Sequence, residues 1–118
     1  MPIMKGVPLT TDVDHKYWSP AELMPRSEIK KLQLGRLIEQ VNYLWEKSSF
    51  YREKWEKSGF HPEKLKTLED MRYIPRLVKE EIRESQEKDP PYGMMRIPGR
   101  GPINRIALTS GTTGEPVV

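Results

Sequence analysis

Residues 25–47 read PRSEIKKLQLGRLIEQVNYLWEK, and they carry the strongest structural signal in this sequence. Their apolar side chains recur at spacings of three and four residues, at Ile29, Leu32, Leu34, Leu37, Ile38, Val41, Leu44 and Trp45. Because these spacings bring the side chains to one face of a helix, the pattern predicts an amphipathic α-helix over residues 25–47. Pro25 suits its first turn, where a missing N–H leaves no hydrogen bond unmade.

Shorter helices are predicted after this one. Ser48 or Ser49 can cap the first of them, and Gly59 can end it in the left-handed conformation. Thr67 is placed to cap the second. Residues 79–87 mix acidic, basic and apolar side chains, as a solvated helix does. The aromatic side chains expected to pack in a core are Tyr17, Trp18, Tyr43, Trp45, Phe50, Tyr51 and Trp55.

The C-terminal part of the chain has a different character. Proline and glycine are frequent there, which predicts a long surface loop, and residues 103–108 form the one convincing strand. A second short strand after the next turn would complete a hairpin. We therefore expect a mostly α fold with a short β-hairpin at the C-terminal end. All of it would be one incomplete domain, with an arm and aromatic turn over 1–24, a helical region over 25–88, and loop, strand and phosphate loop over 89–118.

Composition excludes several classes of protein. The chain has 20 Lys and Arg against 17 Asp and Glu, and the two signs alternate along the predicted helices, which argues against nucleic-acid binding. It has no cysteine, and His15 and His61 lie too far apart for a local metal pair, so no metal site is predicted. No segment is apolar over the length of a membrane span, and residues 1–14 lack the apolar stretch of a signal peptide. We expect a cytoplasmic protein with neither a membrane nor a nucleic-acid partner.

The segment with chemical character is Thr109-Ser110-Gly111-Thr112-Thr113-Gly114-Glu115-Pro116. Its glycines permit positive φ, and successive backbone N–H groups in such a turn form a nest for an anion. Its hydroxyl groups can donate to phosphate oxygens or provide oxygen ligands for Mg²⁺. A hydroxyl-rich tip is a poor structural turn, because it leaves many polar groups in need of partners. The pattern favours a phosphate-binding loop over a plain turn.

Two other phosphate-binding motifs do not fit. A P-loop ends in Gly-Lys-Ser/Thr, whereas Glu115 follows Gly114 here. A dinucleotide fingerprint that started at Gly99 would have Asn104 in place of its third glycine, and Pro102 would remove a backbone N–H that the motif needs.

These segments resemble the phenylacetate–CoA ligase family of AMP-forming adenylating enzymes. The landmarks occur in order along the chain, and they are Tyr17-Trp18-Ser19-Pro20, Met24-Pro25-Arg26, Leu32-Gln33-Leu34, Ser49-Phe50-Tyr51-Arg52, Leu68-Glu69-Asp70-Met71 and Ile74-Pro75. Residues 109–116 resemble the ATP-phosphate loop of that family. By this resemblance, the chain is expected to be an N-terminal fragment of the α/β large domain that ends at the phosphate loop.

The resemblance implies an ATP-dependent acid–CoA ligase. Such an enzyme activates an aryl or aryl-acetic acid as acyl-AMP and transfers the acyl group to CoA, using ATP and Mg²⁺. The residues that would bind the ATP β- and γ-phosphates are Thr109, Ser110, Gly111, Thr112, Thr113 and Gly114. The catalytic residues are expected after Val118, so the fragment alone is predicted to be inactive. The resemblance leaves a homodimer open.

Some positions depart from the family pattern. Glu115 stands where lysine is common, which replaces a positive charge near the phosphates by a negative one. Ala107 stands where histidine is common, and this leaves the identity of the acid open. Leu77-Val78 stands where threonines are usual, which weakens the helix cap before Lys79. Arg105 matches a basic position of the family, and its expected role is structural.

An alternative from another class is a small helical interaction module, or a decayed remnant without catalysis. The mixed-charge surface of the predicted helices would suit such a module. A reading frame that continues beyond Val118 by the length of further domains would favour the ligase.

Overall fold

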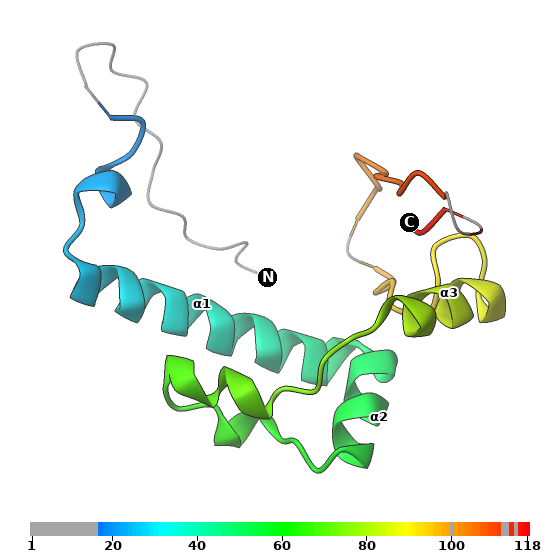
Figure 1. Ribbon diagram of the computed structural model, residues 1–118, viewed down its shortest axis with the longest axis horizontal. Helices are drawn as coiled ribbons and strands as arrows, with labels where there is room; N and C mark the ends of the chain where they lie inside the picture. Colours follow the sequence, from blue (N-terminus) through cyan, green and yellow to red (C-terminus); the bar gives the residue numbers. More distant parts are fainter. Residues whose placement is uncertain (1–16, 100, 112–113, 115) are drawn as a thin grey trace.

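The computed structural model describes residues 17–99, 101–111, 114 and 116–118. In chain order, the elements are η1 (Pro20–Leu23), α1 (Arg26–Lys47), α2 (Ser49–Lys57), η2 (Pro62–Lys64), η3 (Leu68–Tyr73) and α3 (Lys79–Lys88), where η denotes a 3-10 helix. Figure 1 shows α1 as a long rod, with α2 turning away from its C-terminal end. The chain then runs back along α1 through η2 and η3 before it crosses to α3. The division of the chain at residues 24 and 88 stays a prediction.

The helix predicted over residues 25–47 is confirmed as α1. Pro25 is its N-cap, and the Pro25 carbonyl accepts from the N–H groups of Glu28 and Ile29, at 3.0 and 3.1 Å. Glu28 lies in the first turn and Lys47 in the last, so each charge lies at the helix end that its sign stabilises. Gly35 costs such a helix about 1 kcal/mol relative to alanine, and the packing of the apolar face offsets this cost.

Ser48 ends α1 and begins α2. Its N–H donates to the Leu44 carbonyl at 2.9 Å, and its Oγ accepts from the Tyr51 N–H at 3.3 Å. The residue is buried, so these bonds satisfy polar groups that water does not reach. Gly59 follows α2 with a φ of 73°, the left-handed conformation predicted for this helix stop.

The core lies where α1, α2 and the segment after α2 meet. Its buried side chains are Val41, Trp55, Phe60 and Leu65. The ring of Trp55 is nearly parallel to that of Trp45, with centroids 6.5 Å apart, and it contacts Phe60 edge to face at 5.3 Å. Such aromatic pairs contribute about 0.5–1.5 kcal/mol beyond the burial of their area.

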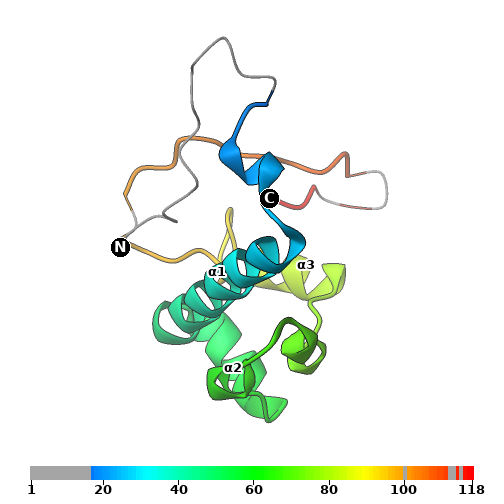
Figure 2. The ribbon, with the colours of Figure 1, turned by 90° about the vertical axis from the view of Figure 1, so that its left-hand side faces the viewer.

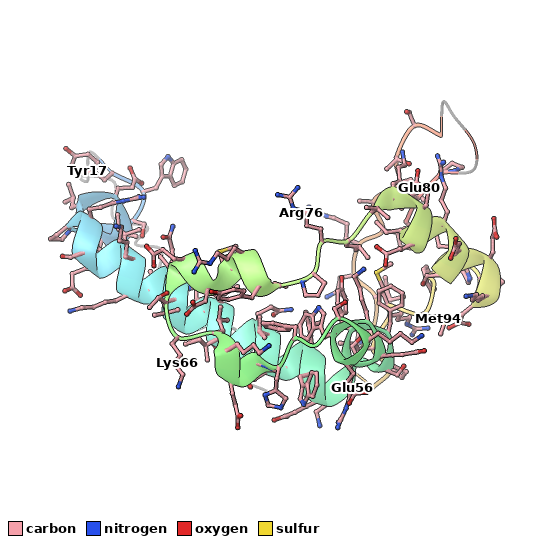
Figure 3. The ribbon with its side chains drawn as sticks, turned by 60° about the horizontal axis from the view of Figure 1, so that its bottom comes forward. Tyr17, Glu56, Lys66, Arg76, Glu80 and Met94 are labelled. Atoms are coloured by element: carbon pink, nitrogen blue, oxygen red, sulfur yellow. The ribbon has the colours of Figure 1, made fainter. Side chains whose placement is uncertain are left out.

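The expectation that the aromatic side chains pack in the core holds for Trp55 and for Trp45 and Tyr51, which are partly buried against it, and is wrong for Tyr17 and Trp18. Trp18 is 81% exposed, and Figure 3 shows Tyr17 at the end of the molecule opposite α3. Backbone capping holds this turn instead of ring burial, because Glu22 Oε1 accepts from the Trp18 N–H at 2.8 Å. Ser19 Oγ accepts from the Ala21 N–H at 3.2 Å.

Carboxylates cap two of the short helices. The helix predicted after Thr67 is confirmed as η3, and Asp70 Oδ2 accepts from the N–H groups of Lys66 and Thr67, at 2.9 and 2.8 Å. The charged helix predicted over residues 79–87 is confirmed as α3. Its N-cap, Val78, has no hydroxyl, and the carboxylate of Glu81 accepts from the Val78 N–H at 2.8 Å. This bond provides one half of a capping box.

The predicted C-terminal β-hairpin is wrong, because the described residues form no strand. Residues 101–110 are exposed, and Figure 2 shows this segment above α1, α2 and α3, at the level of η1. The Thr109 N–H donates to the Val117 carbonyl at 3.0 Å, as in a ladder. The Val117 N–H, however, donates to the Thr109 side-chain Oγ1 at 2.9 Å instead of the Thr109 carbonyl. The apolar residues of 103–108 therefore have no neighbouring strand in the described part of the chain.

Candidate functional site

The predicted phosphate-binding loop lies against α3 (Figure 1). The structure describes Thr109, Ser110, Gly111 and Gly114 of this loop, while Thr112, Thr113 and Glu115 lie outside the described residues. The Gly114 N–H donates to the Gly111 carbonyl at 3.3 Å. Ser110 and Gly114 are exposed, so the described part of the loop is accessible to a ligand.

Thr109 and Val117 join the two limbs of the loop at its base. The backbone N–H of Thr109 and the hydroxyl oxygen of Thr109 both bond to the backbone of Val117, at 3.0 and 2.9 Å. Val117 is buried, 7% exposed, which fixes this base in the protein. The Thr109 hydroxyl keeps its own proton and can still donate it to another acceptor.

The conformation of the loop requires glycine at position 111. Gly111 has a φ of 67°, in the left-handed region that disfavours a side chain. A Cβ at this position would lie 2.9 Å from the Gly114 carbonyl oxygen and 3.0 Å from Cγ of Pro116. The backbone therefore approaches itself closely at this turn, and a side chain at position 111 would force it apart.

Gln86 of α3 contacts the C-terminal limb of the loop twice. Its Nε2 donates to the Pro116 carbonyl at 3.3 Å, and its Oε1 accepts from the Val118 N–H at 3.0 Å. These bonds join residues 30 and 32 positions apart in the sequence.

Arg83 brings a positive charge to the same surface. A Cβ on Gly114 would lie 3.6 Å from both Cζ and one terminal nitrogen of the Arg83 guanidinium. Arg83 and Gln86 line a groove of about 530 Å³ together with Glu87, Leu108, Gly114 and Pro116. An anion held by the loop would thus lie near a guanidinium, which is a strong donor to phosphate oxygens.

Buried contacts pack the turn after α3 against this helix. Ser85 is 2% exposed, and its Oγ accepts from the Met94 N–H at 2.6 Å. Gly93 has a φ of 81°, and a Cβ there would lie 2.7 Å from Ser85 Oγ. Met94 lies on the segment that follows α3, beside the helix (Figure 3). The turn after α3 therefore packs against Ser85 without space for a side chain at position 93.

The first turn of α3 is tied to α2 by charge. Lys54 Nζ donates to Glu81 Oε1, and the two side chains are 18% and 30% exposed. The hydrogen bond from Lys54, together with that from the Val78 N–H, holds the pKa of the Glu81 carboxyl below its usual value. Glu81 therefore stays ionised at neutral pH and links the helix cap to α2.

The residues that sequence reasoning missed are Gln86 and Arg83. Both lie in a helix whose charged pattern predicts a solvated surface. Neither residue belongs to a motif, so no local signal marks it as part of a site. Arg105, by contrast, lines a different groove with Gln40 and Tyr43 of α1, and its structural role stays a prediction.

The chain has recognisable relatives, although no family model matches it. A phenylacetate-coenzyme A ligase of Thermus thermophilus is 34% identical over 102 residues, which are 86% of this chain and 22% of that protein. A protein of the same name from Aromatoleum evansii is 35% identical over 99 residues, which are 84% of this chain and 21% of that protein.

Solved structures of another CoA ligase also match this chain. A crystal structure of 2-hydroxyisobutyryl-CoA ligase with 2-HIB-AMP and CoA, in the thioesterification state, matches 98% of this chain with a TM-score of 0.82 and 40% identity. An open conformation of that enzyme matches 98% of this chain with a TM-score of 0.81 and 37% identity. The chain covers 25% and 27% of these two structures.

The chain is a relative of the phenylacetate–CoA ligases. The resemblance to this family, stated above from the landmarks, is confirmed. The chain spans about a fifth of the length of the phenylacetate–CoA ligases that it matches, at 22% and 21%. It is consistent with the N-terminal region of such an adenylate-forming enzyme.

Two further features bear on partners. The described helices include none that is long and apolar enough to cross a membrane. In the part of the chain that the structure describes, no three His, Cys, Asp or Glu side chains are grouped so that they could hold a metal ion.

Proposed function

We propose that this chain is the N-terminal part of an ATP-dependent acid–CoA ligase that forms an acyl-AMP and then an acyl-CoA. The observation that carries this proposal is the match of 98% of the chain, at 40% identity, to a ligase solved with 2-HIB-AMP and CoA. In such a reaction, the substrate carboxylate attacks the α-phosphate of ATP and pyrophosphate leaves. The CoA thiolate then displaces AMP to form the thioester.

In this proposal, residues 109–114 hold the β- and γ-phosphates of ATP. The positive φ of Gly111, the accessible Ser110 and the guanidinium of Arg83 near Gly114 support this role. Donors that are already oriented toward the leaving pyrophosphate stabilise the charge that develops on it. Mg²⁺ would be held mainly by the phosphates themselves, since this ion usually takes few protein ligands in nucleotide sites.

The proposed acid is an aryl or aryl-acetic acid, as in the curated relatives named for phenylacetate. The solved relatives are named for 2-hydroxyisobutyryl, an aliphatic hydroxy acid, and are 37–40% identical. The acid must therefore be tested with both classes.

The test uses the complete gene product that carries this chain. We expect ATP–pyrophosphate exchange that depends on phenylacetate, and loss of the CoA thiol when CoA is added. Exchange with 2-hydroxyisobutyrate and none with phenylacetate would correct the acid class. No exchange with any acid of either class would contradict the proposed function and favour an interaction module.

A second measurement concerns the 118-residue chain by itself. We expect no saturable heat when ATP is titrated into it, because the loop holds a small share of the contacts that bind a nucleotide. Saturable binding in the micromolar range would contradict this expectation. A cytoplasmic location and a homodimer stay part of the proposal, and cell fractionation and sedimentation would test them.

A further inference from the structure

We propose that Gln86 is a positioning residue that holds the C-terminal limb of the phosphate loop through its side-chain amide. The inference rests on the proposed function, since it concerns the same ATP site. Gln86 lies in α3, outside the loop and outside every motif of the sequence. It would act on the phosphates through the loop backbone.

The amide of Gln86 does what a neighbouring strand would do. A strand offers one C=O and one N–H to each residue pair of its neighbour. Gln86 offers an oxygen to the Val118 N–H at 3.0 Å and an N–H to the Pro116 carbonyl at 3.3 Å. The Pro116 carbonyl and the Val118 N–H, which pair with no strand among the described residues, are thus both bonded to one side chain.

The position of this limb sets the position of the loop. Val117 lies between the two residues that Gln86 holds, and it bonds to Thr109 at 3.0 and 2.9 Å. Thr109 is the first residue of the proposed phosphate-binding segment. A shift of residues 116–118 would therefore move the base of the loop and the direction of its amide groups.

The helix that carries Gln86 is tied to the turn after it and to α2. The neighbouring Ser85 is 2% exposed and accepts from the Met94 N–H at 2.6 Å. Glu81, on the same helix, pairs with Lys54 of α2. The side-chain amide of Gln86 thus bonds residues 116–118 to α3, and α3 contacts α2 through Glu81.

The experiment compares Gln86→Ala with Gln33→Ala in the complete gene product. Gln33 is exposed on α1, so its variant removes the same side chain at a site away from α3. For Gln86→Ala we expect the KM for ATP to rise by up to roughly thirtyfold, the effect of two hydrogen bonds of ordinary net strength. The KM values for the acid and for CoA should stay unchanged, and the unfolding midpoint should fall only slightly, because both bonds are exposed. Gln33→Ala should leave all of these values unchanged.

Gln86→Glu gives a second, sharper test. A carboxylate can still accept from the Val118 N–H, but it cannot donate to the Pro116 carbonyl and would repel it. The KM for ATP of this variant should therefore also rise at neutral pH. It should fall again as the pH is lowered and the carboxyl gains a proton, because the acid form can make both bonds. The Gln86→Ala variant should show no such recovery.

Hydrogen exchange of the peptide over residues 109–118 provides a readout that does not depend on activity. Gln86→Ala should exchange faster there than the wild type, whereas Gln33→Ala should not. Unchanged exchange would overturn the positioning role even in an active enzyme. An equal rise in the KM values for ATP, the acid and CoA, together with a clearly lower unfolding midpoint, would also overturn it. That result would indicate a general structural role for Gln86. If the wild type itself neither binds ATP nor forms an acyl-AMP, the proposed function fails, and faster exchange in the variant would still support the hold on the loop.

Discussion

The ammonium group of Lys54 on α2 contacts the carboxylate of Glu81 at the start of α3. The other oxygen of Glu81 accepts from the Val78 N–H at 2.8 Å and so caps α3. A single carboxylate thus caps the N-terminal end of α3, which carries Gln86, and joins α3 to α2. The same carboxylate makes the attachment of α3 sensitive to acid.

The first prediction concerns pH. The hydrogen bonds from Lys54 and from the Val78 N–H lower the pKa of Glu81, so this group stabilises the fold above the usual carboxyl pKa. That contribution is lost as the pH falls through the lowered pKa. Glu81→Gln should therefore lower the unfolding midpoint at pH 7 and flatten its decline between about pH 5 and pH 3.

Thermal unfolding of the protein as a function of pH measures this effect. Glu84→Gln, at an exposed position of the same helix, is the matched control and should keep the wild-type profile. Part of the decline should persist in both variants, because the N–H groups of Lys66 and Thr67 lower the pKa of Asp70. If the unfolding midpoint of Glu81→Gln fell with acid as steeply as that of the wild type, the Lys54 contact would add nothing to stability.

The second prediction concerns Trp55 in the core. Trp55→Ala should cost about 3–5 kcal/mol, as for other large-to-small core substitutions. The indole N–H of Trp55 is buried and has no hydrogen-bond partner among the described residues. Trp55→Phe removes this unsatisfied donor, which regains about 1–3 kcal/mol and opposes the loss of apolar area. We therefore expect Trp55→Phe to stay within about 1 kcal/mol of the wild type, by denaturant unfolding. A loss as large as that of Trp55→Ala would indicate a partner for the indole N–H.

Local patterns in the sequence predicted the helices well. The spacing of apolar residues in 25–47, the serine pair before α2 and the Thr67 and Asp70 pair each act within a few residues of one another. Their physical causes, namely burial on one face and capping of free N–H groups, are therefore visible in a short window. The landmarks also predicted the family correctly.

The contacts of the loop could not be predicted in this way. The composition of residues 103–108 suggested a strand, but a strand needs a neighbour, and local composition does not say whether one is present. Gln86 bonds to residues 30 and 32 positions away, from a helix whose composition indicates a solvated surface. No local rule connects such positions. The phosphate-binding role of residues 109–114 stays a prediction.

The third prediction concerns the turn behind α3. Gly93→Ala would place a Cβ 2.7 Å from Ser85 Oγ, at a backbone φ of 81°. The variant should lose about 1–3 kcal/mol of stability, because strain in the left-handed region adds to the displacement of a buried side chain. Ser85→Ala removes the acceptor of the Met94 N–H and should cost a similar amount, about 1–3 kcal/mol. The double variant should lose less than the sum of the two, since alanine at position 85 makes space for the new methyl group. Strict additivity in denaturant unfolding would contradict this contact.

The last prediction concerns Gly111 and uses Gly35 as its control. Gly35→Ala adds a methyl group within α1 where no atom other than its chain neighbours and the adjacent helix backbone lies within 4 Å, so it should raise stability by about 0.5–1 kcal/mol and leave the KM for ATP unchanged. Gly111→Ala makes the same chemical change at a φ of 67°, with the new Cβ 2.9 Å from the Gly114 carbonyl oxygen. The loop must open to accept it, and a displacement of about 1 Å at reacting groups can cost roughly a hundredfold in rate. Because Gly111 lies outside the core, the loss of stability should not exceed the roughly 1–3 kcal/mol expected for Gly93→Ala, while ATP-dependent acyl-AMP formation by the complete gene product falls steeply. If Gly111→Ala formed acyl-AMP at the wild-type rate, this turn would have no part in holding ATP.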